Sequence, residues 1–185
     1  MAWIREACGA EIAEAAGGDR AMETLLAAIT ANESGGCRQA YRFAPENHER
    51  LSALLKGAEG EVEGVTGAQL EQRLAGAPNA AEREALLKRL AGLHGYTLLP
   101  GYLSIGWGAT LEELVEKTKH FRYAARRLEE LCRRFGLDPA RQAAEVGRSW
   151  SAGHPNGRTR SALYSWRLQE RMRLYEEGGR SDRAA

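Results

Sequence analysis

The chain has 185 residues, of which 26 are lysine or arginine and 25 are aspartate or glutamate, so its formal net charge is +1. This length is sufficient for one domain with its own hydrophobic core. The near-neutral charge excludes a strongly basic nucleic-acid binder and a strongly acidic tail protein. With 43% hydrophobic and 28% charged residues, the composition is that of a globular protein rather than a disordered or membrane protein.

The sequence contains no sign of a membrane segment or of a metal framework. No apolar run approaches the roughly 20 residues of a membrane helix, and no basic region followed by an apolar stretch marks a signal peptide. We therefore expect synthesis in the cytoplasm and no membrane insertion. Cys8, Cys37 and Cys132 are odd in number and widely spaced, so we expect unpaired, structurally tolerated thiols and no metal or cofactor.

Apolar residues at helical spacing predict a mostly α protein with about eight helices in a single domain over residues 1–177. Residues 178–185 are expected to form a frayed C-terminal tail. The stretch 57–67, which contains four glycines, is interpreted as a mobile linker, and residues 94–108 as the only place for a short hairpin. The predicted helices cover residues 3–16, 20–33, 45–55, 67–76, 79–92, 110–135, 139–150 and 160–177.

The most informative position is Glu33, which follows the apolar stripe of the second predicted helix. It lies four residues after Ile29 and seven after Leu26, and Gly35-Gly36 ends the helix directly afterwards. A carboxyl group on a buried face is expected to keep its proton near neutral pH, because burial disfavours the charged form. Such a group can act as a general acid that protonates a departing glycosidic oxygen. The alternative is a structural glutamate that reaches solvent at the helix end.

Several segments in order resemble the lysozyme-like superfamily, in particular phage N-acetylmuramidases, lytic transglycosylases and goose-type lysozymes. Glu33-Ser34-Gly35-Gly36 is similar to the Glu-Ser-Gly signature of that superfamily. Tyr41-Arg42-Phe43-Ala44-Pro45 resembles the Arg-Phe-Glu-Pro segment of phage endolysins. Leu103-Ser104-Ile105-Gly106-Trp107-Gly108 is similar to a loop that lines the sugar groove. Trp150-Ser151-Ala152-Gly153-His154-Pro155 resembles a late aromatic loop.

This resemblance implies a lysozyme-like fold and cleavage of the bond between N-acetylmuramic acid and N-acetylglucosamine in peptidoglycan. Glu33 would be the general acid, and Tyr41, Ser104, Trp107 and Trp150 would line the groove. Aromatic side chains suit this role because sugar rings present apolar C–H faces, and loops often carry binding residues. A monomeric lysin without a signal peptide would reach the cell wall with the help of a separate protein that permeabilises the membrane.

The chain also departs from the family pattern. Ala44 stands in place of a glutamate, the groove loop has no glutamine, and Ser151 replaces an asparagine. A second catalytic carboxylate is not evident, because Glu46 and Glu49 are expected on a solvated helix face. The transglycosylase branch needs only one acid/base residue, so hydrolysis and formation of anhydro sugars both stay open.

Two other function classes remain as hypotheses. The first is a non-catalytic binding or assembly domain with a degenerate groove, in which Glu33 would be dispensable. The second is a helical nucleic-acid-associated module that uses the arginines of residues 126–134 and 158–173. The near-neutral net charge disfavours the second class, and charge runs on helices are usually solvated. We therefore expect peptidoglycan, and no nucleic acid, as the partner.

Overall fold

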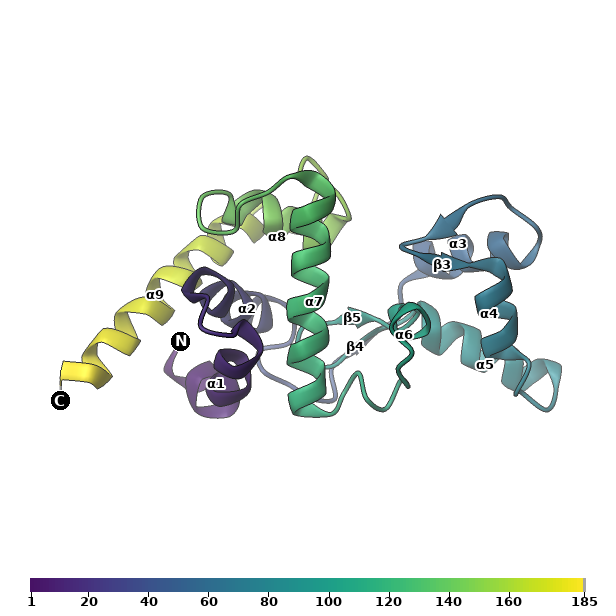
Figure 1. Cartoon of the computed structure of the whole chain (residues 1–185), viewed down its shortest axis with the longest axis horizontal. Coiled ribbons are helices and arrows are strands. Elements are labelled where there is room, and N and C mark those ends of the chain that lie inside the picture. The colour runs from purple at the N-terminus through teal and green to yellow at the C-terminus, as the bar shows by residue number, and fades with distance from the viewer. Residues whose placement is uncertain (185) are drawn as a thin grey trace. The chain divides into compact units, whose positions relative to one another are not determined.

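The computed structural model describes the backbone of residues 1–184 and the side chains of residues 1–179. The prediction of a mostly α protein is confirmed, since the described chain contains nine helices and five strands of two residues each. Its contacts form two compact units (Figure 1). Unit 1 comprises residues 1–37 and 117–185, and unit 2 comprises residues 38–116. The sequence predicted one lysozyme-like domain over residues 1–177. This stays a prediction, because the division into two units does not test it.

Unit 1 is built from five helices, of which α2 is the central one. Nine of the fourteen residues of α2 are buried, and the helix packs against α1 and α9, while α8 packs on α9 (Figure 1). The predicted stripe of α1 is confirmed, because Ile4, Cys8 and Ile12 are fully buried. The five helices are α1 (Ala2–Ala16), α2 (Arg20–Glu33), α7 (Lys117–Phe135), α8 (Ala143–Ala152) and α9 (Tyr164–Ala184).

The starts of α7, α8 and α9 and the end of α9 differ from the sequence prediction. The Thr110–Glu113 capping box forms, with Thr110 N–H donating to Glu113 Oε2 at 2.8 Å and Glu113 N–H to Thr110 Oγ1 at 3.1 Å. It stabilises only a series of turns, however, and α7 begins at Lys117. Helix α8 begins at Ala143 rather than at 139. Helix α9 begins at Tyr164 and continues to Ala184, so the described part of the predicted frayed tail is helical; Ala185 lies outside the described residues.

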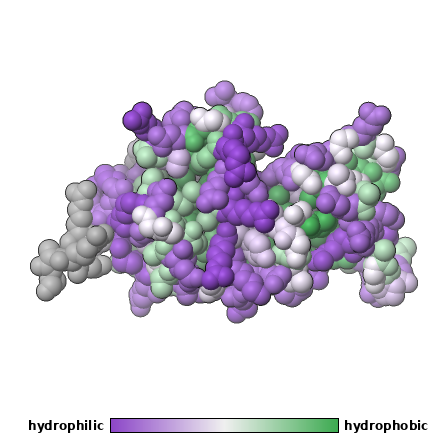
Figure 2. Space-filling model, viewed as in Figure 1, coloured by the Kyte–Doolittle hydropathy of each residue, from purple (hydrophilic) through white to green (hydrophobic). Residues whose placement is uncertain are grey.

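Helix α7 presents one solvated face. Figure 2 shows a hydrophilic stripe along this helix, and its exposed polar residues recur at helical spacing. Arg126 of this face donates to the half-buried Glu130 at 2.9 Å. The opposite face carries the buried residues, among them His120, Phe121, Leu128 and Leu131. The stripe consists of Lys119, Arg122, Arg126, Glu129 and Arg133.

Unit 2 combines four short helices with two small antiparallel sheets. The first sheet has the order β1-β4-β5, with Tyr41 opposite His94 and Leu93 opposite Pro100. The hairpin expected within residues 94–108 is therefore present as β4–β5, followed by α6. The elements are β1 (Tyr41–Arg42), α3 (Pro45–Leu55), α4 (Gly67–Leu74), α5 (Ala80–Ala91), β4 (Leu93–His94), β5 (Leu99–Pro100) and α6 (Leu103–Trp107).

A second hairpin occupies the stretch that the sequence predicted to be a mobile linker. Strands β2 (Glu61–Val62) and β3 (Val65–Thr66) pair with Val62 opposite Val65, and both valines are buried. Glu63 and Gly64 form the turn at φ of 47° and 83°, the two positive values that a tight hairpin turn of type I′ requires. Tyr102 Oη donates to Glu63 Oε1 at 2.7 Å and connects the turn to α6. The linker prediction was wrong because Gly64 forms the hairpin turn and Gly67 begins α4.

Candidate functional site

Glu33 is the last residue of α2, at the point where the chain turns away from the helix. The Ser34 N–H continues the helical pattern to the Thr30 carbonyl at 3.2 Å, and the Gly36 N–H donates to Ser34 Oγ at 3.1 Å. Gly35 and Gly36 then take φ of 64° and 81°, values that favour glycine. The sequence placed Glu33 on the buried face, whereas the structure places it at the edge of that face, half-buried, because the fully buried run of α2 stops at Ala31.

Tyr164, the first residue of α9, orients the Glu33 carboxyl group. The buried phenol donates a hydrogen bond from Oη to Glu33 Oε1 at 2.8 Å, across 131 positions of sequence. A buried tyrosine hydroxyl ordinarily finds a polar partner, and here the partner is the candidate acid. This pairing has no signal in the sequence, because Tyr164 is in phase with Leu168 and Tyr175 on the apolar face of its helix.

A second pair of contacts joins the same two helix ends. Asn32 Nδ2 donates to the Tyr164 carbonyl at 3.4 Å, and Arg171 Nη1 donates to Asn32 Oδ1 at 2.7 Å. Arg171 lies two helical turns after Tyr164, on the same face of α9. Burial, with the charge of Arg167 as the second cause, lowers the pKa of Arg171. Side-chain hydrogen bonds thus join the end of α2 to the N-terminal part of α9.

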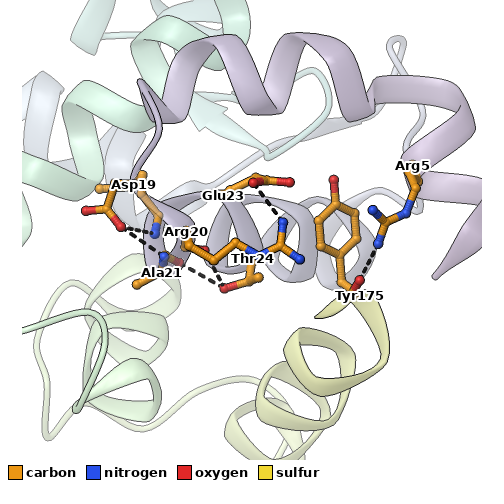
Figure 3. Close-up of polar contacts among 8 residues, drawn as sticks. Arg5, Asp19, Arg20, Ala21, Glu23, Thr24 and Tyr175 are labelled. Carbon is orange, nitrogen blue, oxygen red and sulfur yellow. Dashed lines mark hydrogen bonds and ion pairs between the residues drawn. The ribbon is translucent and has the colours of Figure 1, made fainter. Parts of the chain in front are cut away.

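Farther along α9, a cluster around Tyr175 fixes the helix against α1 and α2 (Figure 3). The Arg5 guanidinium lies 4.2 Å from the centre of the Tyr175 ring and donates to the Tyr175 carbonyl. Arg20 lies 5.9 Å from the same ring and pairs with Glu23 at 2.9 Å. Burial, followed by the charge of Glu23, raises the pKa of the Tyr175 phenol. This cluster lies about three turns after Tyr164, so it helps to determine where Tyr164 stands relative to Glu33.

Trp150, the other predicted site residue in unit 1, lies in the core. Its side chain is 7% exposed, and the Arg127 guanidinium lies 5.4 Å from its ring. The ring belongs to α8, one residue after the fully buried Ser149. The expectation that Trp150 lines a sugar groove does not fit this position, because a ring packed inside the unit offers no face to a ligand.

The three remaining predicted site residues belong to unit 2 and have different exposures. Tyr41 is 53% exposed on β1, with its ring 5.1 Å from that of His94 and packed over Gly92. Trp107 is half-buried at the end of α6. Ser104 is fully buried, and its hydroxyl donates to the Gly101 carbonyl at 2.7 Å. Ser104 thus stabilises the turn before α6 rather than facing a groove.

The other groups that the sequence analysis considered are two glutamates and three cysteines. Glu46 and Glu49 are exposed on α3, as expected for a solvated face. In the part of the chain that the structure describes, we find no group of three His, Cys, Asp or Glu side chains that could hold a metal ion, and no helix long and apolar enough to cross a membrane. The three cysteines are unpaired, with Cys8 buried and Cys37 exposed. Glu33 with Tyr164 is therefore the candidate site in unit 1.

Comparisons of this chain with protein-family models, with curated proteins and with solved structures gave no match. A functional assignment consequently depends on the chemistry of the described side chains. Glu33 has the features that such an assignment needs: a carboxyl group, partial exposure, a hydrogen-bond donor at one oxygen, and a position where the chain opens into a turn.

Proposed function

We propose that this protein is a peptidoglycan-cleaving glycosidase of the muramidase type, with Glu33 as its general acid. The observation that carries the proposal is the half-buried Glu33 at the end of α2, oriented by the Tyr164 hydroxyl at 2.8 Å. A carboxyl group in a fixed orientation and with partial access to solvent can reach a glycosidic oxygen. The resemblance of residues 33–36 to the Glu-Ser-Gly signature supplies the substrate class.

In the proposed reaction, the Glu33 carboxyl group gives its proton to the glycosidic oxygen as the bond from the anomeric carbon to that oxygen breaks. The transition state has the character of an oxocarbenium ion. An attacking hydroxyl then bonds to the anomeric carbon and returns its proton to the Glu33 carboxylate. If that hydroxyl belongs to water, the product has a reducing end; if it belongs to the muramic acid residue itself, the product is an anhydro sugar.

One acid/base residue suffices for the second route. The exposed carboxylates Glu46 and Glu49 belong to unit 2, and we assign neither of them a role. Tyr164 is a positioning residue in this proposal, since its hydroxyl donates to the Glu33 carboxyl group. Tyr41 and Trp107 remain candidates for contact with sugar rings, because their side chains are at least partly accessible.

The test is the loss of turbidity of purified peptidoglycan with the wild type and with Glu33→Gln. We expect the substitution to lower the rate by at least ~100-fold, because general acid catalysis contributes roughly 10²–10⁴-fold. Mass spectrometry of the product ends separates hydrolysis from anhydro-sugar formation. Glu6→Gln is the matched control, since Glu6 is an exposed glutamate on α1. Equal rates for wild type and Glu33→Gln would disprove the role of Glu33.

Tyr164→Phe tests the positioning role separately. Removing the hydroxyl leaves the ring in place, so the fold should be retained while the orientation of Glu33 is lost. We expect the rate to fall by up to roughly 10-fold, because a hydrogen bond between the Tyr164 hydroxyl and the protonated Glu33 carboxyl group is worth ~0.5–1.5 kcal/mol. The pH–rate profile should also shift, whereas a purely structural role for Tyr164 would change the unfolding temperature and leave that profile unchanged.

A non-catalytic binding or assembly domain is the second candidate. The observation that favours it is the burial of Ser104 and Trp150, which removes two of the four predicted sugar contacts. In that case wild type and Glu33→Gln would bind sedimented peptidoglycan equally well, and neither would release soluble fragments from the walls of several bacteria.

A further inference from the structure

Unit 2 contains a cleft of about 520 Å³ that none of the predicted site residues lines. One wall is a face of α5 on which Glu82, Leu86 and Arg89 recur at helical spacing. The second wall is the end of α4, with Arg73, and the third is formed by Leu111 and Glu112. Its volume lies within the ~300–1,000 Å³ range that is common for small-ligand sites.

The cleft has an apolar floor and a charged rim of both signs. Leu111 is 5% exposed and Leu86 is half-buried, so these side chains form the floor. Glu82 and Arg89 are exposed on the rim. Arg89 Nη2 lies 3.0 Å from Glu112 Oε1, and Arg73, which is half-buried, donates from Nη2 to the Ala109 carbonyl at 3.3 Å. Both arginines are therefore oriented by contacts within unit 2.

This charge pattern restricts the kind of ligand. Two arginines and two glutamates give a rim without net charge, so a polyanion such as nucleic acid would meet as much repulsion as attraction. A purely apolar ligand would have to cover four charged side chains, and desolvating charges is costly. A ligand with small apolar groups, at least one carboxylate and at least one ammonium group would find a partner for each.

We infer that this cleft binds a short zwitterionic peptide with small side chains, which in peptidoglycan is the peptide stem attached to muramic acid. Such a stem offers alanine methyl groups to Leu86 and Leu111 and carboxylates to the arginines. The free amine of its diamino acid suits Glu82, whose position is set by Asn79 Nδ2 at 3.1 Å. The identification of the peptide rests on the proposed function, whereas the cleft and its charges do not.

The experiment is calorimetric titration of the full chain with the free stem tetrapeptide alanine–γ-glutamate–diaminopimelate–alanine. We expect binding by the wild type and by Glu33→Gln with the same affinity. Ala85→Trp should weaken it at least tenfold, because Ala85 lines the cleft and a tryptophan there fills it. Ala81→Trp is the matched control, one turn earlier on the same helix and exposed, outside the cleft lining.

A charge-specific variant makes the test sharper. Glu82→Gln keeps the size of the side chain and should weaken binding several-fold, but only for a tetrapeptide whose side-chain amine is free. With that amine acetylated, wild type and Glu82→Gln should bind equally. No binding by the wild type, or equal binding by wild type and Ala85→Trp, would overturn the inference.

The failure of this inference and that of the proposed function can be told apart. One outcome is cleavage that depends on Glu33, with the same KM for glycan strands with and without peptides. It would disprove the peptide site and support the glycosidase. The other outcome is peptide binding that Ala85→Trp abolishes, with no cleavage by the wild type. It would support the peptide site and indicate a domain that binds the cell wall without cutting it.

Discussion

The two units are organised by different means. Unit 1 consists of five helices of 10 to 21 residues, whose buried faces come from regular helical spacing. Unit 2 has four helices of 5 to 12 residues and two sheets with strands of two residues. Long helices make their backbone hydrogen bonds internally, so in unit 1 the side chains decide how the elements pack. In unit 2 the packing of the elements depends more on turns and on close approaches between backbone segments.

The candidate sites follow this difference. In unit 1 the site is a junction of helix ends, where Tyr164 of α9 donates to Glu33 of α2. In unit 2 the cleft lies beside α5, which is followed directly by the β4–β5 hairpin, where the Gly101 N–H donates to the Gly92 carbonyl at 2.8 Å. We therefore expect the largest loss in the free energy of unfolding from substitutions that crowd the backbone in unit 2. Substitutions that disturb side-chain packing in unit 1 should cost less.

The largest expected effect is that of Gly101→Ala in unit 2. An added Cβ would lie 2.6 Å from the Arg89 carbonyl oxygen and 2.9 Å from that of Leu90, and neither can move without disturbing the end of α5. We expect the free energy of unfolding in urea to fall by about 3 kcal/mol, the upper part of the usual range for overpacking. Gly106→Ala is the control, because its nearest neighbour would be Val65 Cγ2 at 3.9 Å.

The corresponding change in unit 1, Gly147→Ala, should be milder. Gly147 lies where α8 packs on α9, and an added Cβ would collide with the Leu168 Cδ2 methyl. This methyl is the end of a flexible side chain, and alanine is the better helix former by about 1 kcal/mol, so we expect a net loss of about 1 kcal/mol. The double variant with Leu168→Val should show clear non-additivity; strict additivity would mean that the two residues do not meet.

Loss of a helix cap should cost a similar amount in either unit. Asp19 accepts from the Ala21 and Met22 N–H groups at 2.9 and 3.1 Å, and Asn79 accepts from the Glu82 N–H at 2.9 Å. We expect Asp19→Ala and Asn79→Ala each to lower the free energy of unfolding by about 1 kcal/mol. Asp19→Asn retains a capping oxygen and should lose much less; an equal loss would contradict the capping role.

The smallest effect concerns pH and His94 of unit 2. Burial is the main cause that lowers the pKa of His94, against the opposing hydrogen bond to the Arg89 carbonyl at 2.7 Å. The unfolded state then binds more protons than the folded state below the ordinary histidine pKa of about 6.5, so stability is lost as the pH falls from 7 to 5. We expect His94→Gln to reduce the slope of the free energy of unfolding against pH by less than about 1.4 kcal/mol per pH unit. An unchanged slope would show that other groups cause it.

The sequence prediction was most accurate where structure depends on neighbouring residues. The spans of α1, α2, α3 and α5 agree with the predicted helices to within two residues, since caps and apolar spacing are local signals. The hairpin of β2 and β3 was missed, although Glu63-Gly64 between two apolar residues is a local turn signal. It was read as flexibility because glycine serves both turns and linkers.

The site prediction was less accurate because exposure is not a local property. Ser104 and Trp150 occur in segments that resemble a sugar-binding groove, yet Ser104 is fully buried and Trp150 is 7% exposed. Tyr164 is in phase with the apolar residues of its helix and is buried, yet its hydroxyl donates to Glu33. Whether a side chain faces solvent depends on which other elements pack against it, and that is decided by contacts between residues far apart in sequence.

The amino-acid sequence by itself determined the mostly α class, the capped start of α2 at Asp19 and the end of that helix beyond Glu33. These features follow from hydrogen bonds and steric preferences within a few residues. Only the tertiary structure decided that Tyr164, 131 positions away, orients the Glu33 carboxyl group, and that α4, α5 and Leu111 enclose a charged cleft. These features depend on the packing of distant elements, which the periodicity of a single segment does not specify.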